Sequence, residues 1–188
     1  PSAELFINGV SQGVRTKDTS VTLENSWDEE SEKALKRQSR YRLMWMDTKY
    51  EPGTVKVVAY NEAGEAVAER EVTTAGKPHH IELSVDRDTI EANGKDLAFV
   101  TVSVVDKNGN LCPAADNLIE FSVAGEGHYR AGANGNSVSL ELFHEPKMKA
   151  FSGMMTAIVE SNDAPGTITL TARSKGLKSA KIVINSKK

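Results

Sequence analysis

The chain has 188 residues, of which 39% are hydrophobic and 26% are charged, with a formal net charge of −3. This composition is typical of a globular protein with one or two domains. The basic residues are spread along the chain, and no apolar run approaches the roughly 20 residues that cross a bilayer, so we expect neither a nucleic-acid partner nor a membrane span.

Short runs that alternate apolar and polar residues, separated by turn residues, dominate the chain. This period of two predicts antiparallel strands with one buried face. Glycine and asparagine in the connections tolerate the positive φ that tight hairpins need. In chain order, we expect strands at 3–8, 41–47, 54–60, 66–73, 80–86, 97–106, 118–124, 153–160, 167–173 and 179–185.

One segment, 26–38, breaks this pattern and predicts a short helical insertion. Ser26 and Glu29 have the spacing of a capping box. The acidic residues come first and the basic residues last, which suits the helix macrodipole. Because the apolar face is thin, we expect a solvated surface helix docked by Trp27, with a partner-docking helix as the alternative.

The strand pattern stops at 73–78, where glycine and proline occur, and then starts again. This break predicts a domain boundary. We therefore expect an all-β protein of two tandem immunoglobulin-like β-sandwiches, covering 1–75 and 76–188.

The aromatic residues favour a structural role over a sugar-binding platform. Alternation places Trp45 on the apolar face of the strand at 41–47, where it would supply a large buried area to a small sandwich. Tyr50 lies in a turn before a strand and is expected to be partly exposed. If the chain bound a sugar, the candidate exposed aromatic residues would be Trp27, Tyr50 and Tyr129.

We expect no catalytic residue, no metal site and no cofactor. Glycoside hydrolysis needs two carboxylates roughly 5 to 10 Å apart, and the acidic residues here lie in turns or alternate with bases. The adjacent His79 and His80 would point to opposite faces of a strand. Cys112 has no basic residue nearby and is expected to be a half-buried structural thiol. The stretch 106–112 has its glycine too early for a calcium loop, which predicts a hairpin turn.

Two long stretches resemble known modules. The first runs from a strand that ends in Asn-Gly, through a tryptophan, to Tyr-x-Pro-Gly before a valine-rich strand. It resembles the immunoglobulin-like module that follows the catalytic barrel in many bacterial family 2 glycoside hydrolases, although the charged segment 18–40 is longer than expected. The second, 81–136 with its tail 150–184, looks like the C-terminal domain of the same β-galactosidase-like enzymes. The matching positions of the first stretch are Asn8, Gly9, Trp45, Tyr50, Pro52, Gly53, Ala59, Tyr60 and Gly64.

The resemblance implies a non-catalytic C-terminal region of a bacterial β-galactosidase that degrades carbohydrate in the periplasm or outside the cell. Its partner would be the catalytic TIM barrel of the same parent chain, and a homo-oligomer contact is a further expectation. A barrel needs roughly 250 residues of its own, so no catalytic residue is carried over to this chain. The chain begins with Pro1, so we expect a piece of a longer polypeptide.

Two other functions remain open at this point. A carbohydrate-binding module would need exposed, coplanar aromatic side chains. The second domain is also similar to the repeats of invasin-type adhesins, which would make the chain part of a surface stalk.

Overall fold

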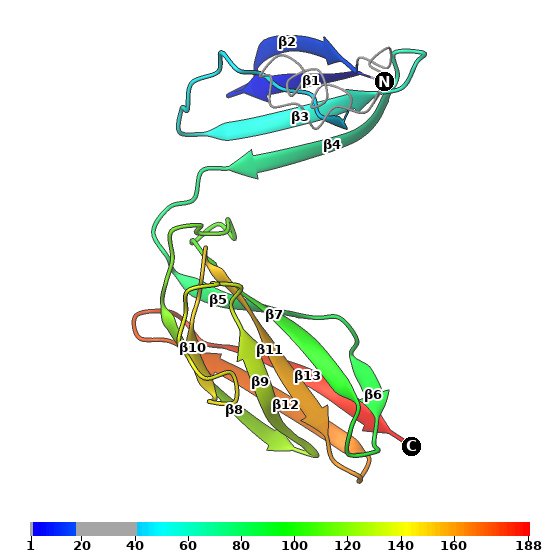
Figure 1. Ribbon diagram of the computed structural model, residues 1–188, viewed down its shortest axis with the longest axis vertical. Helices are drawn as coiled ribbons and strands as arrows, with labels where there is room; N and C mark the ends of the chain where they lie inside the picture. Colours follow the sequence, from blue (N-terminus) through cyan, green and yellow to red (C-terminus); the bar gives the residue numbers. More distant parts are fainter. Residues whose placement is uncertain (1, 18–40) are drawn as a thin grey trace, which may run out of the picture. The chain divides into compact units, whose positions relative to one another are not determined.

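A computed structural model describes residues 2–17 and 41–188, which form three β-sheets (Figure 1). The all-β class is therefore confirmed. The predicted helix at 26–38 and Trp27 lie outside the described residues. The chain divides into two compact units, Pro1–Thr74 and Ala75–Lys188, which we describe separately.

The first unit contains one four-stranded antiparallel sheet in the order β2-β1-β3-β4. Alternate residues of β1 are buried, namely Ala3, Leu5 and Ile7, as the period of two predicts. Since the described residues of this unit supply a single sheet, its assignment as a sandwich stays a prediction. The strands are β1 (Ser2–Ile7), β2 (Val10–Thr16), β3 (Thr54–Tyr60) and β4 (Ala66–Thr73).

The strand predicted at 41–47 is wrong, because these residues form an irregular connection that precedes β3. Trp45 is half-buried in this connection. Its indole N–H donates a hydrogen bond to the backbone oxygen of Gly13 in β2 at 2.8 Å. The Trp45 backbone oxygen accepts a hydrogen bond from the Thr48 hydroxyl at 3.0 Å. Trp45 therefore fastens the connection to an edge strand, and it is not the central core residue that alternation predicts.

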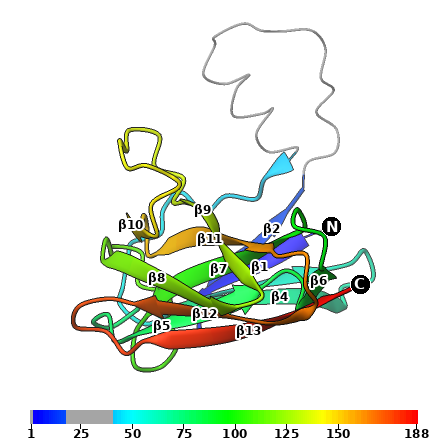
Figure 2. The ribbon, with the colours of Figure 1, turned by 90° about the horizontal axis from the view of Figure 1, so that it is seen from below.

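The second unit is a sandwich of two sheets (Figure 2). One sheet has the order β10-β8-β12-β13-β6, and the other has the order β5-β7-β11-β9. All neighbours are antiparallel except β13 and β6, which are parallel. The strands are β5 (His80–Val85), β6 (Thr89–Glu91), β7 (Leu97–Val105), β8 (Leu118–Gly125), β9 (Gly127–Ala133), β10 (Lys147–Lys149), β11 (Met154–Ser161), β12 (Gly166–Arg173) and β13 (Ala180–Lys187).

The core of the second unit lies between the two sheets. Every second residue along β7 is almost fully buried, which is the alternation that predicted this strand. The facing strands β8, β12 and β13 supply the other half of the core from their own alternate positions. The inward-facing side chains with no measurable exposure include Ala98, Val100, Val104, Ile119, Ala157, Val159, Ile168, Leu170, Ala172 and Ile184.

Four strands were not predicted. Two of them, β6 and β10, have three residues each, too few to give a clear alternation. The strand β2 is mostly exposed, so its apolar residues do not mark a buried face. The strand β9 has the sequence GHYRAGA, in which glycine and alanine leave little apolar signal.

Candidate functional site

Two carboxylates of the sandwich surface, Asp96 and Glu160, are engaged with bases or backbone N–H groups. Glu160 contacts the Arg130 guanidinium at 2.9 Å, which joins β11 to β9. Asp96 accepts a hydrogen bond from the Glu91 backbone N–H at 2.8 Å and contacts Arg87 at 3.0 Å. These bonds, with the backbone N–H first, hold the pKa of Asp96 below its usual value. Glu160 therefore links two neighbouring strands, and Asp96 links the residues around β6.

Within the described part of the chain, the carboxylate that accepts the most hydrogen bonds is that of Asp106, directly after β7. One of its oxygens accepts hydrogen bonds from the backbone N–H groups of Asn108 and Asn110, and the other accepts from the Gly76 N–H and the Asn110 side-chain amide. The Gly76 N–H makes the largest contribution to a pKa far below the usual value of an aspartate. The expected hairpin turn is thus present, and its carboxylate oxygens are occupied by the protein. Among the described residues, no group of three or more histidine, cysteine, aspartate or glutamate side chains could hold a metal ion.

The two adjacent histidines do not point to opposite faces, contrary to the prediction. His79 precedes β5 and is free to turn towards His80, so that their Nδ1 atoms lie 3.0 Å apart. Burial lowers the pKa of His79. The pair therefore forms a local hydrogen bond at the start of the sandwich, and His80 extends it to Glu82 at 3.2 Å.

Cys112 is more buried than predicted, with 4% of its surface exposed. Its Sγ lies 3.7 Å from the backbone oxygen of Gly76. Burial raises the pKa of the thiol, which keeps it protonated at neutral pH. A protonated, buried thiol is a poor nucleophile.

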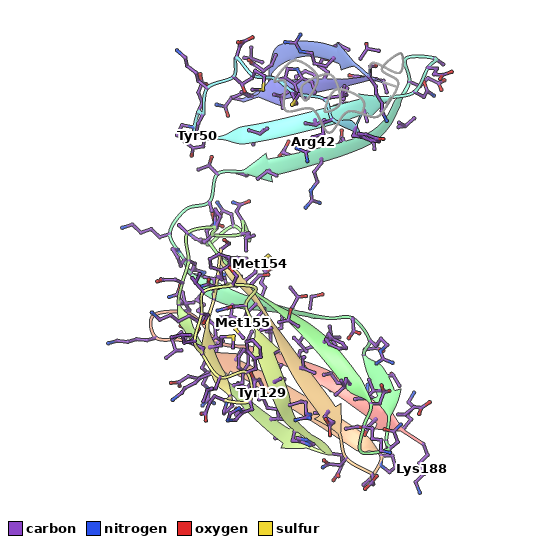
Figure 3. The ribbon with its side chains drawn as sticks, viewed as in Figure 1. Arg42, Tyr50, Tyr129, Met154, Met155 and Lys188 are labelled. Atoms are coloured by element: carbon purple, nitrogen blue, oxygen red, sulfur yellow. The ribbon has the colours of Figure 1, made fainter. Side chains whose placement is uncertain are left out.

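Two of the candidate sugar-binding aromatic residues, Tyr50 and Tyr129, lie within the described residues (Figure 3). Tyr50 lies on the surface of the first unit, 78% exposed, with its hydroxyl 3.4 Å from that of Thr74. Tyr129 lies in the second unit and is half-buried, contrary to the exposed position expected. Its ring stacks on Phe121 with centroids 5.5 Å apart, and its hydroxyl is buried without a hydrogen-bond partner. Burial raises the pKa of Tyr129 to about 12. The third candidate, Trp27, lies outside the described residues.

A different surface feature lies between β9 and β10, where the segment 134–146 loops outward from the strands (Figure 2, yellow). The side chains of Asn134, Ser139 and Glu141 in this segment face inward. Glu141 accepts hydrogen bonds from the Lys149 backbone N–H at 3.0 Å and from the Ser139 hydroxyl at 3.2 Å. The Asn134 side-chain amide donates to the Lys149 backbone oxygen at 3.0 Å. The segment is therefore fastened to the outer edge of β10 by side chains.

The apolar side chains of the same segment face solvent. Val138 is 82% exposed, Leu140 94%, Leu142 59% and Phe143 61%. We call these four residues the apolar ridge. The backbone beneath it is also held, since the Phe143 oxygen accepts a hydrogen bond from the Gly132 N–H in β9 at 2.7 Å. This arrangement reverses the usual pattern, in which apolar groups face the core and polar groups face water.

Sequence reasoning missed the apolar ridge. The signal is the alternation of valine and leucine with serine and glutamate at 138–142. Alternation shows that two faces differ, but it does not show which face is buried. Only the hydrogen bonds to Lys149 reveal that the polar face lies inward.

Comparison with known proteins defines the class of the chain. Residues 81–183 match the model of the glycoside hydrolase family 2 C-terminal domain 5, and residues 1–68 match a domain of unknown function, DUF4982. The chain therefore belongs to the C-terminal domains of glycoside hydrolase family 2. The apolar ridge lies inside the matched range of the second unit.

Individual relatives are consistent with this family. The chain is 46% identical to the β-galactosidase BoGH2A of Bacteroides ovatus over 97% of its own length, and 35% identical to a β-galactosidase of Thermoanaerobacter pseudethanolicus over 59%. A solved family 2 glycosyl hydrolase from Bacteroides cellulosilyticus matches all of the chain with a TM-score of 0.80 and 32% identity. A β-glycosidase from Bacteroides vulgatus matches 98% of it with a TM-score of 0.81 and 26% identity.

These relatives are much longer than the chain. The chain spans 19% of the Bacteroides ovatus protein, 13% of the Thermoanaerobacter protein, and 22% and 21% of the two solved structures. No helix in the described ranges 2–17 and 41–188 is long and apolar enough to cross a membrane.

Proposed function

We propose that the chain is the non-catalytic C-terminal region of a bacterial family 2 glycoside hydrolase, and that the parent enzyme is a β-galactosidase. The observation that carries this proposal is the 46% identity to a β-galactosidase over nearly the whole chain. A second relative, with 35% identity, is also a β-galactosidase. The β-glucuronidase from Formosa agariphila is less similar, at 26% identity. The substrate of the parent is therefore a β-galactoside.

The role of the chain in this enzyme is structural. A catalytic TIM barrel needs roughly 250 residues, more than the 188 present. In the second unit, Asp96, Asp106 and Glu160 are each held by hydrogen bonds or ion pairs, which suits carboxylates that stabilise the fold. A sandwich with a continuous buried core provides a rigid body that supports the barrel of the same polypeptide.

The experiment compares the parent enzyme with the isolated 188-residue chain on a chromogenic β-galactoside and a matching β-glucuronide. The parent should hydrolyse the galactoside in preference, and the isolated chain should hydrolyse neither. Turnover by the isolated chain in proportion to its concentration would contradict a non-catalytic role. Preference of the parent for the glucuronide would contradict the proposed substrate.

The two other functions considered above receive less support. The family match is to a domain of glycoside hydrolases, which does not favour an adhesin. A carbohydrate-binding module is not favoured, because the ring of Tyr129 is half-buried and its hydroxyl is buried. Titration of the isolated chain with galactosides tests this directly, since saturable quenching of tryptophan fluorescence would restore the binding function.

We include two further elements in the proposal, an extracytoplasmic location and a homo-oligomeric parent. A location in the periplasm or outside the cell suits an enzyme that degrades carbohydrate from outside, and fractionation of the source cells tests it. Light scattering of the parent enzyme tests the oligomeric state.

A further inference from the structure

The apolar ridge has the properties of a surface that is covered in the complete enzyme. We propose that Val138, Leu140, Leu142 and Phe143 dock onto the remaining, catalytic part of the same parent polypeptide. This inference rests on the proposed function and adds to it the surface that makes the contact. Isolated exposed leucines are common on protein surfaces, but here four apolar side chains are exposed within six residues.

The segment is built to hold these side chains outward. Its polar groups, on Asn134, Ser139 and Glu141, are bonded to each other or to the backbone of Lys149. If the apolar residues turned inward, these hydrogen bonds would be lost and a carboxylate would be turned away from its backbone donor. A segment fixed in advance loses little conformational entropy when it binds, which is typical of a contact surface.

The chemistry of the ridge favours a permanent intramolecular contact. None of the four side chains is charged, and Glu141 between them faces the segment's own backbone. Permanent interfaces are more apolar than transient ones and resemble a divided core. A contact within one polypeptide also benefits from a high effective concentration, so a small apolar surface is sufficient.

The lengths of the relatives indicate which occupant is available. The match to the solved Bacteroides cellulosilyticus enzyme includes all of this chain but only 22% of that enzyme. Nearly four fifths of that polypeptide therefore lies outside the matched part. The ridge lies within the range that matches the family model. We therefore assign the ridge to a surface of the catalytic part and not to a second copy of the chain.

Thiol labelling tests the assignment. Leu140→Cys places a thiol at the most exposed position of the ridge, where the substitution cannot disturb the core. Val183→Cys, which is 51% exposed on β13 and separated from β10 by β8 and β12 in the same sheet, is the matched control. The rate of reaction with a maleimide is measured by peptide mass spectrometry in the 188-residue chain and in the parent enzyme, at a concentration where light scattering shows a monomer.

We expect the thiol at position 140 to react at least tenfold more slowly in the monomeric parent than in the isolated chain, with a smaller change at position 183. An equal rate in both proteins would overturn the proposal. Slow reaction already in the isolated chain would assign the ridge to a contact within these 188 residues or between copies, and would also overturn it. Protection that disappears on dilution of an oligomeric parent would indicate a second copy instead.

A second variant separates docking from folding. Leu140→Glu should leave the thermal unfolding midpoint of the isolated chain unchanged and lower that of the parent by several degrees. Equal midpoints in the parent with and without the substitution would argue against docking. Activity on the chromogenic galactoside is recorded in the same samples. An active parent with a freely reacting thiol would overturn this inference alone, and an inactive parent would overturn the proposed function alone.

Discussion

The side chain of Asn8 occupies the space that a side chain at position 53 would need. Its Oδ1 accepts a hydrogen bond from the Thr54 backbone N–H at 2.8 Å, and its amide donates to the Pro52 oxygen at 3.2 Å. A Cβ added to Gly53 would overlap the Asn8 side chain. Asn8 also occupies the turn between β1 and β2 with a positive φ of 50°. One asparagine thus joins the first hairpin to the start of β3.

Gly53→Ala should destabilise the first unit more than Gly64→Ala. Both glycines have positive φ, at 137° and 79°, but a Cβ at position 64 would meet no atom within 4 Å. We expect about 1 kcal/mol from backbone strain at Gly64. At Gly53 we expect about 3 kcal/mol, because the two hydrogen bonds of Asn8 are also lost.

Tryptophan fluorescence during urea unfolding measures this difference, because both tryptophans of the chain, Trp27 and Trp45, lie in the sequence of the first unit. An equal decrease in the free energy of unfolding for Gly53→Ala and Gly64→Ala would show that Asn8 moves aside without loss of stability.

Asp106→Asn should reduce the stability of the second unit at neutral pH and weaken its dependence on acid. The pKa of Asp106 is lower in the folded chain than the value of about 3.9 expected when unfolded. The carboxylate therefore stabilises the fold above about pH 4, and this stabilisation is lost as the pH falls below that value. Calorimetry between pH 7 and pH 2.5 should show the wild type and the variant converging at low pH. Asp163→Asn, at an exposed position, is the control. A stability difference between the wild type and Asp106→Asn that stays constant with pH would contradict the prediction.

Tyr129→Phe should leave the second unit equally stable or more stable. The tyrosine hydroxyl is buried without a partner, so its removal relieves a desolvation cost of about 1 kcal/mol while the stacking on Phe121 is kept. Tyr129→Leu, which removes the ring, should cost about 1 kcal/mol through the lost aromatic pair alone. Calorimetric unfolding compares the two variants. A clear loss of stability in Tyr129→Phe would indicate that the hydroxyl has a partner in solution.

Glu141→Ala should release the segment between β9 and β10 from the edge of the sheet. Its carboxylate accepts the hydrogen bond of the Lys149 backbone N–H at 3.0 Å, so this amide should exchange with solvent at least tenfold faster in the variant. Glu145→Ala is the matched control, because the Glu145 carboxylate lies 3.8 Å from the neighbouring His144 and accepts no hydrogen bond from a backbone N–H of the described residues. Hydrogen exchange followed by NMR measures both. Unchanged exchange at Lys149 in Glu141→Ala would show that the segment is held by other contacts.

The sequence was informative where burial and alternation coincide. The run at 97–106 predicted β7 to within a residue, because valine is buried at every second position. The same rule failed at 41–47, where alternation is present but Trp45 is held by a hydrogen bond to Gly13, 32 residues earlier in the chain. Such a contact leaves no local pattern. The apolar ridge was missed for a related reason, since the orientation of 138–142 depends on Lys149.

The fastening of Lys149 bears on how the protein behaves at high concentration. At this end of β10, the backbone oxygen and N–H that point away from the sheet are satisfied by Asn134 and Glu141. An edge strand with unpaired backbone groups beside four apolar side chains could pair with strands of neighbouring molecules and promote amyloid-like aggregation. We therefore expect the bonds from Asn134 and Glu141 to limit self-association of the isolated chain through this edge.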